Sequence, residues 1–168
     1  TPVPSRAMHE RAAEFSEGVP ERYGIDVDVL EFDAGTKTAA AAADAVGCDA
    51  AAIASTIVVS LADEGNGGGL GAAITSSANR LDLDAVADHF DAAAAAMADP
   101  DRIRETIGWS IGGVPPLSHD ATIPTVFDPT LTEYDTVYAA AGTPSALFAI
   151  DPRRLADLAD ATVIDLTE

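Results

Sequence analysis

Cysteine and histidine are scarce in this sequence, and their scarcity argues against several kinds of site. Cys48 is the only cysteine, which excludes an internal disulfide and any cysteine-rich zinc site. The histidines, His9, His89 and His119, are scattered along the chain and form no HExxH pattern. We therefore expect neither a metal nor any other cofactor.

Positive charge is also scarce. The 168 residues include 28 Asp and Glu against 9 Lys and Arg, a formal net charge of −19, and Lys37 is the only lysine. Binding along nucleic acid requires many cations that neutralise phosphates, so we expect no extended nucleic-acid-binding face. Because 48% of the residues are hydrophobic, the charge does not indicate disorder. We interpret it as a halophilic adaptation to molar salt, which screens self-repulsion; an acidic partner-binding surface is the alternative.

Long apolar runs are absent. No stretch reaches the 18 apolar residues of a membrane span, and Thr1–Arg6 lacks the apolar core of a signal peptide. These features predict a cytoplasmic protein that does not enter a membrane. The length fits one domain over residues 1–168, because no repeat or linker divides it.

Local patterns predict helices and strands in alternation. The segment 53–61 is apolar and β-branched, as in a central strand, and Asn66-Gly67 predicts a hairpin to a strand over 70–76. Asp99-Pro100, an N-cap followed by proline at the first helical position, marks the start of a helix over 100–107. Further strands are expected at 27–32, 91–97, 123–127, 136–140, 146–150 and 163–166, further helices at 6–23, 39–46, 82–90 and 153–159, a helical turn capped by Asp49, and a turn at 128–131. The pattern predicts one α/β domain with a mixed sheet.

The segment from Gly108 to Asp120 combines the only tryptophan with adjacent glycines and adjacent prolines. Glycines let backbone amides approach a ligand, and prolines fix the neighbouring φ angles. Such a loop can hold N–H groups around a bound oxygen, as an oxyanion site requires. The alternative is a tight connection between two elements, with Trp109 as a hydrophobic plug.

A phosphate-binding loop is not expected. The glycine-rich segment Gly65–Gly69 and the segment Gly35–Thr38 both fail to match the GxxxxGK[ST] pattern of nucleotide-binding loops.

Short motifs follow one another in a characteristic order. They are Gly35–Ala39, Ile53–Val59, Asn79–Asp82, Met97–Pro100, Gly112–Pro116, Phe127–Asp128, Tyr138–Pro144 and Asp151–Leu155. In this order they resemble the YbaK family of aminoacyl-tRNA deacylases, which is related to the editing domain of bacterial prolyl-tRNA synthetases. The resemblance implies a curved mixed β-sheet flanked by helices.

The resemblance also implies an activity: hydrolysis of the ester at the 3′ end of a mischarged tRNA, with a small amino acid such as Ala, Cys or Pro. The family's site loop has glycine and proline four residues apart, which Gly112 and Pro116 match. Gly112, Gly113 and Pro116 would position the carbonyl, while a ribose hydroxyl of the substrate assists water. The implied substrate-binding residues are Ser55, Thr56, Arg80, His119 and Gly142, with Ser55 and Thr56 facing the pocket.

One position departs from the family pattern. The family usually has a lysine on the central strand where this chain has Ser55. Serine has no charge, so about 1–3 kcal/mol of phosphate or transition-state stabilisation is missing unless another group supplies it. Arg80 and His119 are candidates to hold the ribose-phosphate end. Two alternatives to a deacylase stay open: a non-catalytic module that binds aminoacyl-tRNA or a small ligand, and an unrelated small-metabolite binder or hydrolase.

Overall fold

The structure is a computed structural model that describes residues 10–24, 29–31, 43–44, 46–62, 69–109, 114–117, 123–142 and 146–167. Its elements follow in the order α2 (Glu10–Tyr23), β1 (Val29–Glu31), η1 (Ala50–Ala52), β2 (Ile53–Ala62), β3 (Gly69–Ser76), α4 (Leu83–His89), β4 (Ala94–Met97), α5 (Pro100–Ile107), β5 (Thr125–Phe127), η2 (Pro129–Glu133), β6 (Val137–Ala140), β7 (Ala146–Ile150), α6 (Pro152–Leu158) and β8 (Thr162–Val163).

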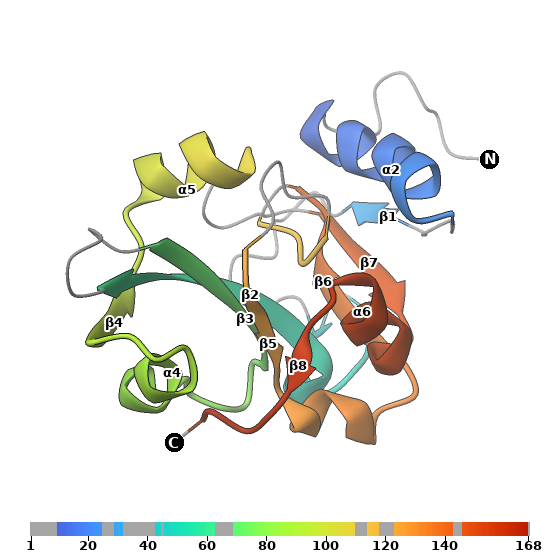
Figure 1. Cartoon of the computed structure of the whole chain (residues 1–168). Coiled ribbons are helices and arrows are strands. Elements are labelled where there is room, and N and C mark those ends of the chain that lie inside the picture. The colour runs from blue at the N-terminus through green and yellow to red at the C-terminus, as the bar shows by residue number, and fades with distance from the viewer. Residues whose placement is uncertain are drawn as a thin grey trace.

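The strands form one eight-stranded mixed sheet around β2. Its order is β1-β7-β6-β2-β3-β5-β8, and β4 also pairs with β2. The pairs β2–β6, β3–β5 and β5–β8 are parallel, whereas the other pairs are antiparallel. Figure 1 shows β2 and β3 as a long curved pair that crosses the molecule. The predicted α/β domain with a curved mixed sheet is confirmed.

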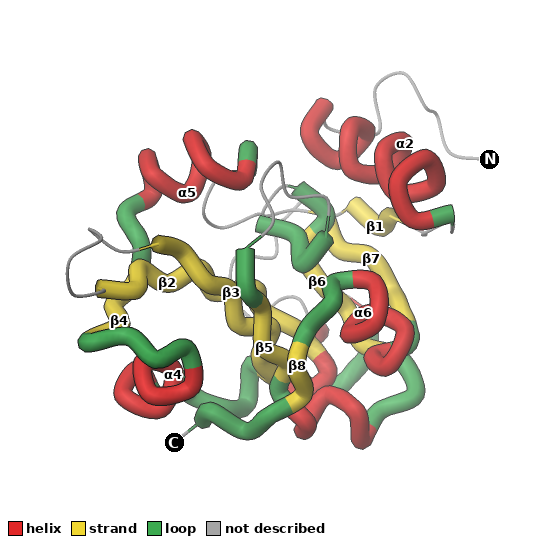
Figure 2. Tube along the Cα trace, in the orientation of Figure 1, coloured by secondary structure: helices red, strands yellow, loops and turns green. Residues whose placement is uncertain are grey.

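Each face of the sheet packs against a different set of helices. Side chains alternate between the faces along β2, so Ala54 and Val58 share the larger core cluster with residues of α2, α5 and α6. Val59 and Leu61 point to the opposite face and share a second cluster with Val86 of α4. Figure 2 shows this arrangement, with α2 and α5 together on one side and α4 on the other.

Capping residues fix the ends of several helices. The carboxylate of Asp82 accepts hydrogen bonds from the first turn of α4, and that of Asp151 does the same for α6. Gly47, with φ of 77°, ends the helical residues before η1, and its N–H donates to the carbonyl of Ala43 at 2.8 Å.

Several elements differ from the prediction. Asp49 precedes η1 but its side chain makes no capping hydrogen bond, since the turn is only three residues long. The segment predicted as a turn at 128–131 is the 3-10 helix η2, because Asp128 caps it. The strand predicted at 91–97 begins only at Ala94, after a residue with left-handed φ, Asp91. The final strand is short, over Thr162–Val163.

The helices of the described residues include none that is long and apolar enough to cross a membrane.

Candidate active site at an interruption of the sheet

Among the described residues, the central strand β2 has no strand partner along part of one edge. On that edge β6 pairs with Ile53 and Ala54, and β4 pairs with Val59–Ala62. Within the described residues no strand pairs with the intervening segment Ser55–Val58 on this side, although the N–H of Ala98 donates to the carbonyl of Val58 at 3.1 Å. We call Ser55–Val58 the sheet interruption.

Three of the four residues of the interruption are partly exposed. Ser55, Thr56 and Ile57 are partly exposed, whereas the neighbouring Ala54 and Val58 are both 3% exposed. Alternate residues of a strand direct their backbone polar groups to the same edge, and the carbonyl of Val58 points toward Ala98. The N–H and C=O of Thr56 therefore point into the interruption.

The hydroxyl of Thr56 is a buried polar atom without a hydrogen-bond partner in the part of the chain that the structure describes. Buried hydroxyls in folded proteins nearly always have a partner, so an orphan hydroxyl requires an explanation. A bound ligand would supply one. Thr56 therefore combines a buried hydroxyl that lacks a partner among the described residues with a backbone amide that points into the interruption, and both groups can donate a hydrogen bond to an oxygen atom.

Gly142 lies close to the interruption in the topology. Strand β6 runs parallel to β2 in the register Ala54↔Ala139, and Gly142 comes two residues after the end of β6. Gly142 is buried and has a φ of 99°, a conformation that suits glycine. Gly142 thus follows the strand that pairs with Ile53 and Ala54, the two residues before Ser55.

Ser55 and Thr56, both predicted to face the pocket, do not point to the same face of the sheet. They are consecutive in a regular ladder with β3, in which Ser55 pairs with Thr75 and Thr56 with Ile74, so their side chains point to opposite faces. Thr56 lies on the face of the larger core cluster, and Ser55 lies on the face where Ser77 is found. One ligand would contact both side chains only at the open edge of the sheet interruption.

The described part of the glycine-proline segment lies against the face that carries Thr56. Val114 and Leu117 are 6% and 1% exposed and belong to the larger core cluster, and Pro116 between them is buried. Helix α5 leads into this segment, and Gly108 ends the helix with a φ of 85°. Trp109 is buried in the same cluster, so it does act as a hydrophobic plug.

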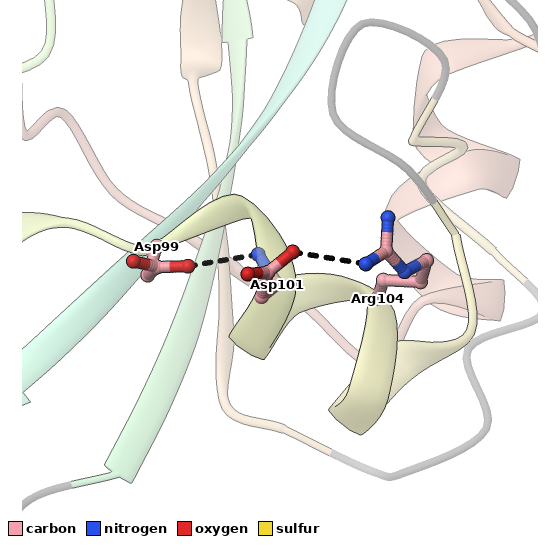
Figure 3. A network of polar contacts seen from close by, with 3 residues as sticks. All are labelled: Asp99, Asp101 and Arg104. Carbon is pink, nitrogen blue, oxygen red and sulfur yellow. Dashed lines mark hydrogen bonds and ion pairs between the residues drawn. The ribbon is translucent and has the colours of Figure 1, made fainter.

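Figure 3 shows how α5 begins. The carboxylate of Asp99 accepts a hydrogen bond from the N–H of Asp101 at 2.8 Å, and Arg104 pairs with Asp101 at 2.9 Å. The side chains of this ion pair are 60% and 76% exposed, so the pair contributes little to stability. The cap fixes the helix that positions Trp109.

Of the other predicted site residues, Arg80 is exposed in the turn between β3 and α4. Gly112, Gly113 and His119 lie outside the described residues.

A polar network around Asp128 was not predicted as part of the site. Asp128 is 3% exposed, and its carboxylate accepts hydrogen bonds from the N–H of Ser76 at 3.1 Å, from Asn79 Nδ2 at 2.9 Å and from the N–H of Thr130 at 2.9 Å. The network holds the turn after β3 in place. Asn79 and Asp128 carry the sequence signal as two of the ordered motifs, but only the tertiary structure joins them.

Ser77 also escaped prediction. Its hydroxyl lies 3.0 Å from that of Ser55 and donates to the carbonyl of Ile53 at 2.8 Å. A serine in a polar turn has no sequence feature that indicates such a contact.

Two further observations bear on the chemistry of the site. Burial, followed by the negative charge of Asp49, raises the pKa of the Cys48 thiol, which lowers the fraction of reactive thiolate. Among the residues that the structure describes, no cluster of His, Cys, Asp and Glu is suited to hold a metal ion.

Comparison with known proteins decides the family. The sequence profile of the aminoacyl-tRNA editing domain matches residues 33–158. The chain belongs to the aminoacyl-tRNA editing domain family. The interruption, the glycine-proline segment and the Asp128 network all fall within the part of this editing domain that the profile matches.

Solved structures support the assignment. A protein proposed as a trans-editing enzyme for prolyl-tRNA synthetase is 34% identical, with a TM-score of 0.88, and the match covers 96% of this chain and 99% of that one. A structure from work on computational grafting of linear epitopes onto scaffold proteins is 33% identical, with a TM-score of 0.87 and the same coverage. A hypothetical protein is 29% identical, with a TM-score of 0.79, and covers 94% of this chain and 99% of its own.

Proposed function

We propose that this editing domain is a trans-acting deacylase that hydrolyses the ester of a mischarged tRNA carrying a small amino acid such as Ala, Cys or Pro. The observation that carries the proposal is the sheet interruption with the orphan hydroxyl of Thr56, in a chain of the editing-domain family. Its net charge of −19 leads us to place it in a salt-rich cytoplasm.

The proposed reaction needs a polarised carbonyl and a positioned water. The N–H and Oγ1–H of Thr56 would donate hydrogen bonds to the ester carbonyl oxygen, where negative charge develops. Gly112, Gly113 and Pro116 would complete this carbonyl site. Water adds to the acyl carbon, the bond from that carbon to the ribose 3′ oxygen breaks, and the neighbouring ribose hydroxyl relays the proton to the leaving oxygen.

The tRNA would be gripped only at its 3′ end. Arg80 and His119 are proposed to hold the ribose-phosphate portion, and Gly142 allows the backbone to approach the substrate. Nine cations against 28 acidic residues leave little affinity for the body of the tRNA.

Deacylation in molar KCl tests the proposal. Alanyl-, cysteinyl-, prolyl- and seryl-tRNA are each mixed with the protein, and ester loss is compared with the uncatalysed rate. Thr56→Val removes the hydroxyl while keeping the shape, and we expect kcat to fall about 100–1,000-fold, because one oxyanion donor is lost. Thr56→Ser is expected to recover most of the rate, and the exposed Thr162→Val is the matched control.

A non-catalytic binding module is the second candidate. It is favoured by the contact of Ser55 with the neutral Ser77, where the family usually has a lysine. Measurable binding of the charged tRNA without any ester loss above the background would establish it and reject the deacylase.

A further inference from the structure

The hydroxyls of Ser55 and Ser77 form a directed pair. Ser77 Oγ donates to the carbonyl of Ile53 at 2.8 Å, and a serine hydroxyl has a single proton. In the 3.0 Å contact between the two hydroxyls, Ser55 must therefore be the donor. The proton of Ser55 is thus committed, and its oxygen is left with lone pairs that only accept hydrogen bonds.

The surrounding structure holds this direction in place. The N–H of Ser77 also donates to the carbonyl of Ile53, at 2.9 Å. The preceding Ser76 donates its hydroxyl to the carbonyl of Ala51 at 2.7 Å, and Asp128 anchors the same turn through the N–H of Ser76. If Ser77 were the donor in this pair, its hydroxyl would have to give up its hydrogen bond to the carbonyl of Ile53. The backbone N–H of Ser77 binds the same carbonyl and keeps the hydroxyl close to it.

The position of Ser55 makes its acceptor oxygen accessible to a ligand. Ser55 and Ser77 are both partly exposed, and Ser55 lies in the sheet interruption. Phosphate oxygens and the ester carbonyl are themselves acceptors, so an oxygen whose proton is committed cannot bind them. The chain's charge of −19 also disfavours a phosphate and favours a cation.

We infer that Ser55 Oγ accepts a hydrogen bond from the α-ammonium group of the aminoacyl moiety, with Ser77 as the positioning residue that directs it. The inference rests on the proposed function, because it takes the interruption to be the aminoacyl site. Position 55 then selects a free amino group instead of a phosphate. An N-blocked aminoacyl ester, which lacks the ammonium, is a poorer ligand.

The test compares alanyl-tRNA with N-acetyl-alanyl-tRNA in molar KCl, using the wild type and Ser55→Ala. A hydrogen bond to a charged group corresponds to about a tenfold change or more, so the wild type should prefer alanyl-tRNA by at least that factor in kcat/KM. Ser55→Ala should lose that preference by slowing on alanyl-tRNA alone. Ser60→Ala is the control: it lies on the same strand outside the interruption, where its hydroxyl accepts a hydrogen bond from Arg102.

Two outcomes would overturn the inference: equal loss on both substrates in Ser55→Ala, or no wild-type preference for the free amine. A ribose hydroxyl bound at Ser55 would produce the first outcome. If the wild type hydrolyses neither substrate, the deacylase proposal fails, and binding then decides the inference. Alanine linked by an amide to 3′-aminoadenosine, with and without an N-acetyl group, is titrated onto both proteins. Weakening by Ser55→Ala of the free-amine analogue alone supports the ammonium site, and unchanged binding rejects it.

Discussion

Replacing Phe15 with alanine is expected to lower the free energy of unfolding by about 3–5 kcal/mol, as for other fully buried phenylalanines. Phe15 is 0% exposed, its ring lies 4.9 Å from that of Phe148, and it meets Trp109 edge-on at 6.2 Å and 76° between ring planes. Each aromatic contact adds about 0.5–1.5 kcal/mol to the burial, which places the loss toward the upper end of the range. Helix α2 would then be held to the core mainly by Val19.

Urea unfolding in molar KCl, followed by fluorescence, measures this loss. The chain has one tryptophan, Trp109, and it is 5% exposed beside Phe15, so its emission reports on this contact. For a domain of this size the melting temperature should fall by about 2–4 °C per kcal/mol, or roughly 6–20 °C. Glu17→Ala on the exposed side of α2 is the control and should change stability by less than about 0.5 kcal/mol. A loss below about 1 kcal/mol in Phe15→Ala would refute the packing of α2 against the core.

Asp128→Ala should lower the free energy of unfolding in urea by about 3 kcal/mol or more, because three N–H donors lose a buried carboxylate. Asp49→Ala is the control and should be near neutral, because the Asp49 side chain makes no capping hydrogen bond. Equal effects of the two substitutions would contradict this reasoning. Gly108→Ala should lower the free energy of unfolding by about 1–2 kcal/mol, because the φ of Gly108 is 85°. Gly18→Ala should raise it by about 0.5–1 kcal/mol, because Gly18 lies in α2 with open space around it. The reverse order would refute the helix-end assignment. Because its pKa is raised, the thiol of Cys48 should react with iodoacetamide at pH 8.5 more slowly than free cysteine, and Asp49→Asn should speed it; an unchanged rate in the variant would exclude the charge effect. The melting temperature should rise from dilute buffer to molar KCl, and a full melting temperature at low salt would show that the acidic charge is no salt adaptation.

Elements bounded by local chemistry are the ones that the sequence predicts well. The helix over Pro100–Ile107 starts after Asp99 and stops at Gly108, because capping and a left-handed φ are decided by residues a few positions apart. The central strand follows in the same way from its β-branched run. The 3-10 helix after Asp128 is less predictable, since a capping residue before proline suits a turn equally well.

The candidate site depends on pairings between distant segments. The interruption exists because β6 pairs only with the start of β2, whereas β4 pairs only with its end. No local pattern sets either register, so the sequence could not show that Ser55 and Thr56 lose a neighbour there. The adjacent polar residues Ser55 and Thr56 in a mainly apolar strand are the only sequence feature that indicates the site.

Release of the amino acid from alanyl-tRNA by the purified protein in molar KCl tests the central claim most directly. We expect ester loss well above the uncatalysed rate in the wild type, and a rate reduced about 100–1,000-fold in Thr56→Val. Stable alanyl-, cysteinyl- and prolyl-tRNA in the presence of folded protein would contradict it.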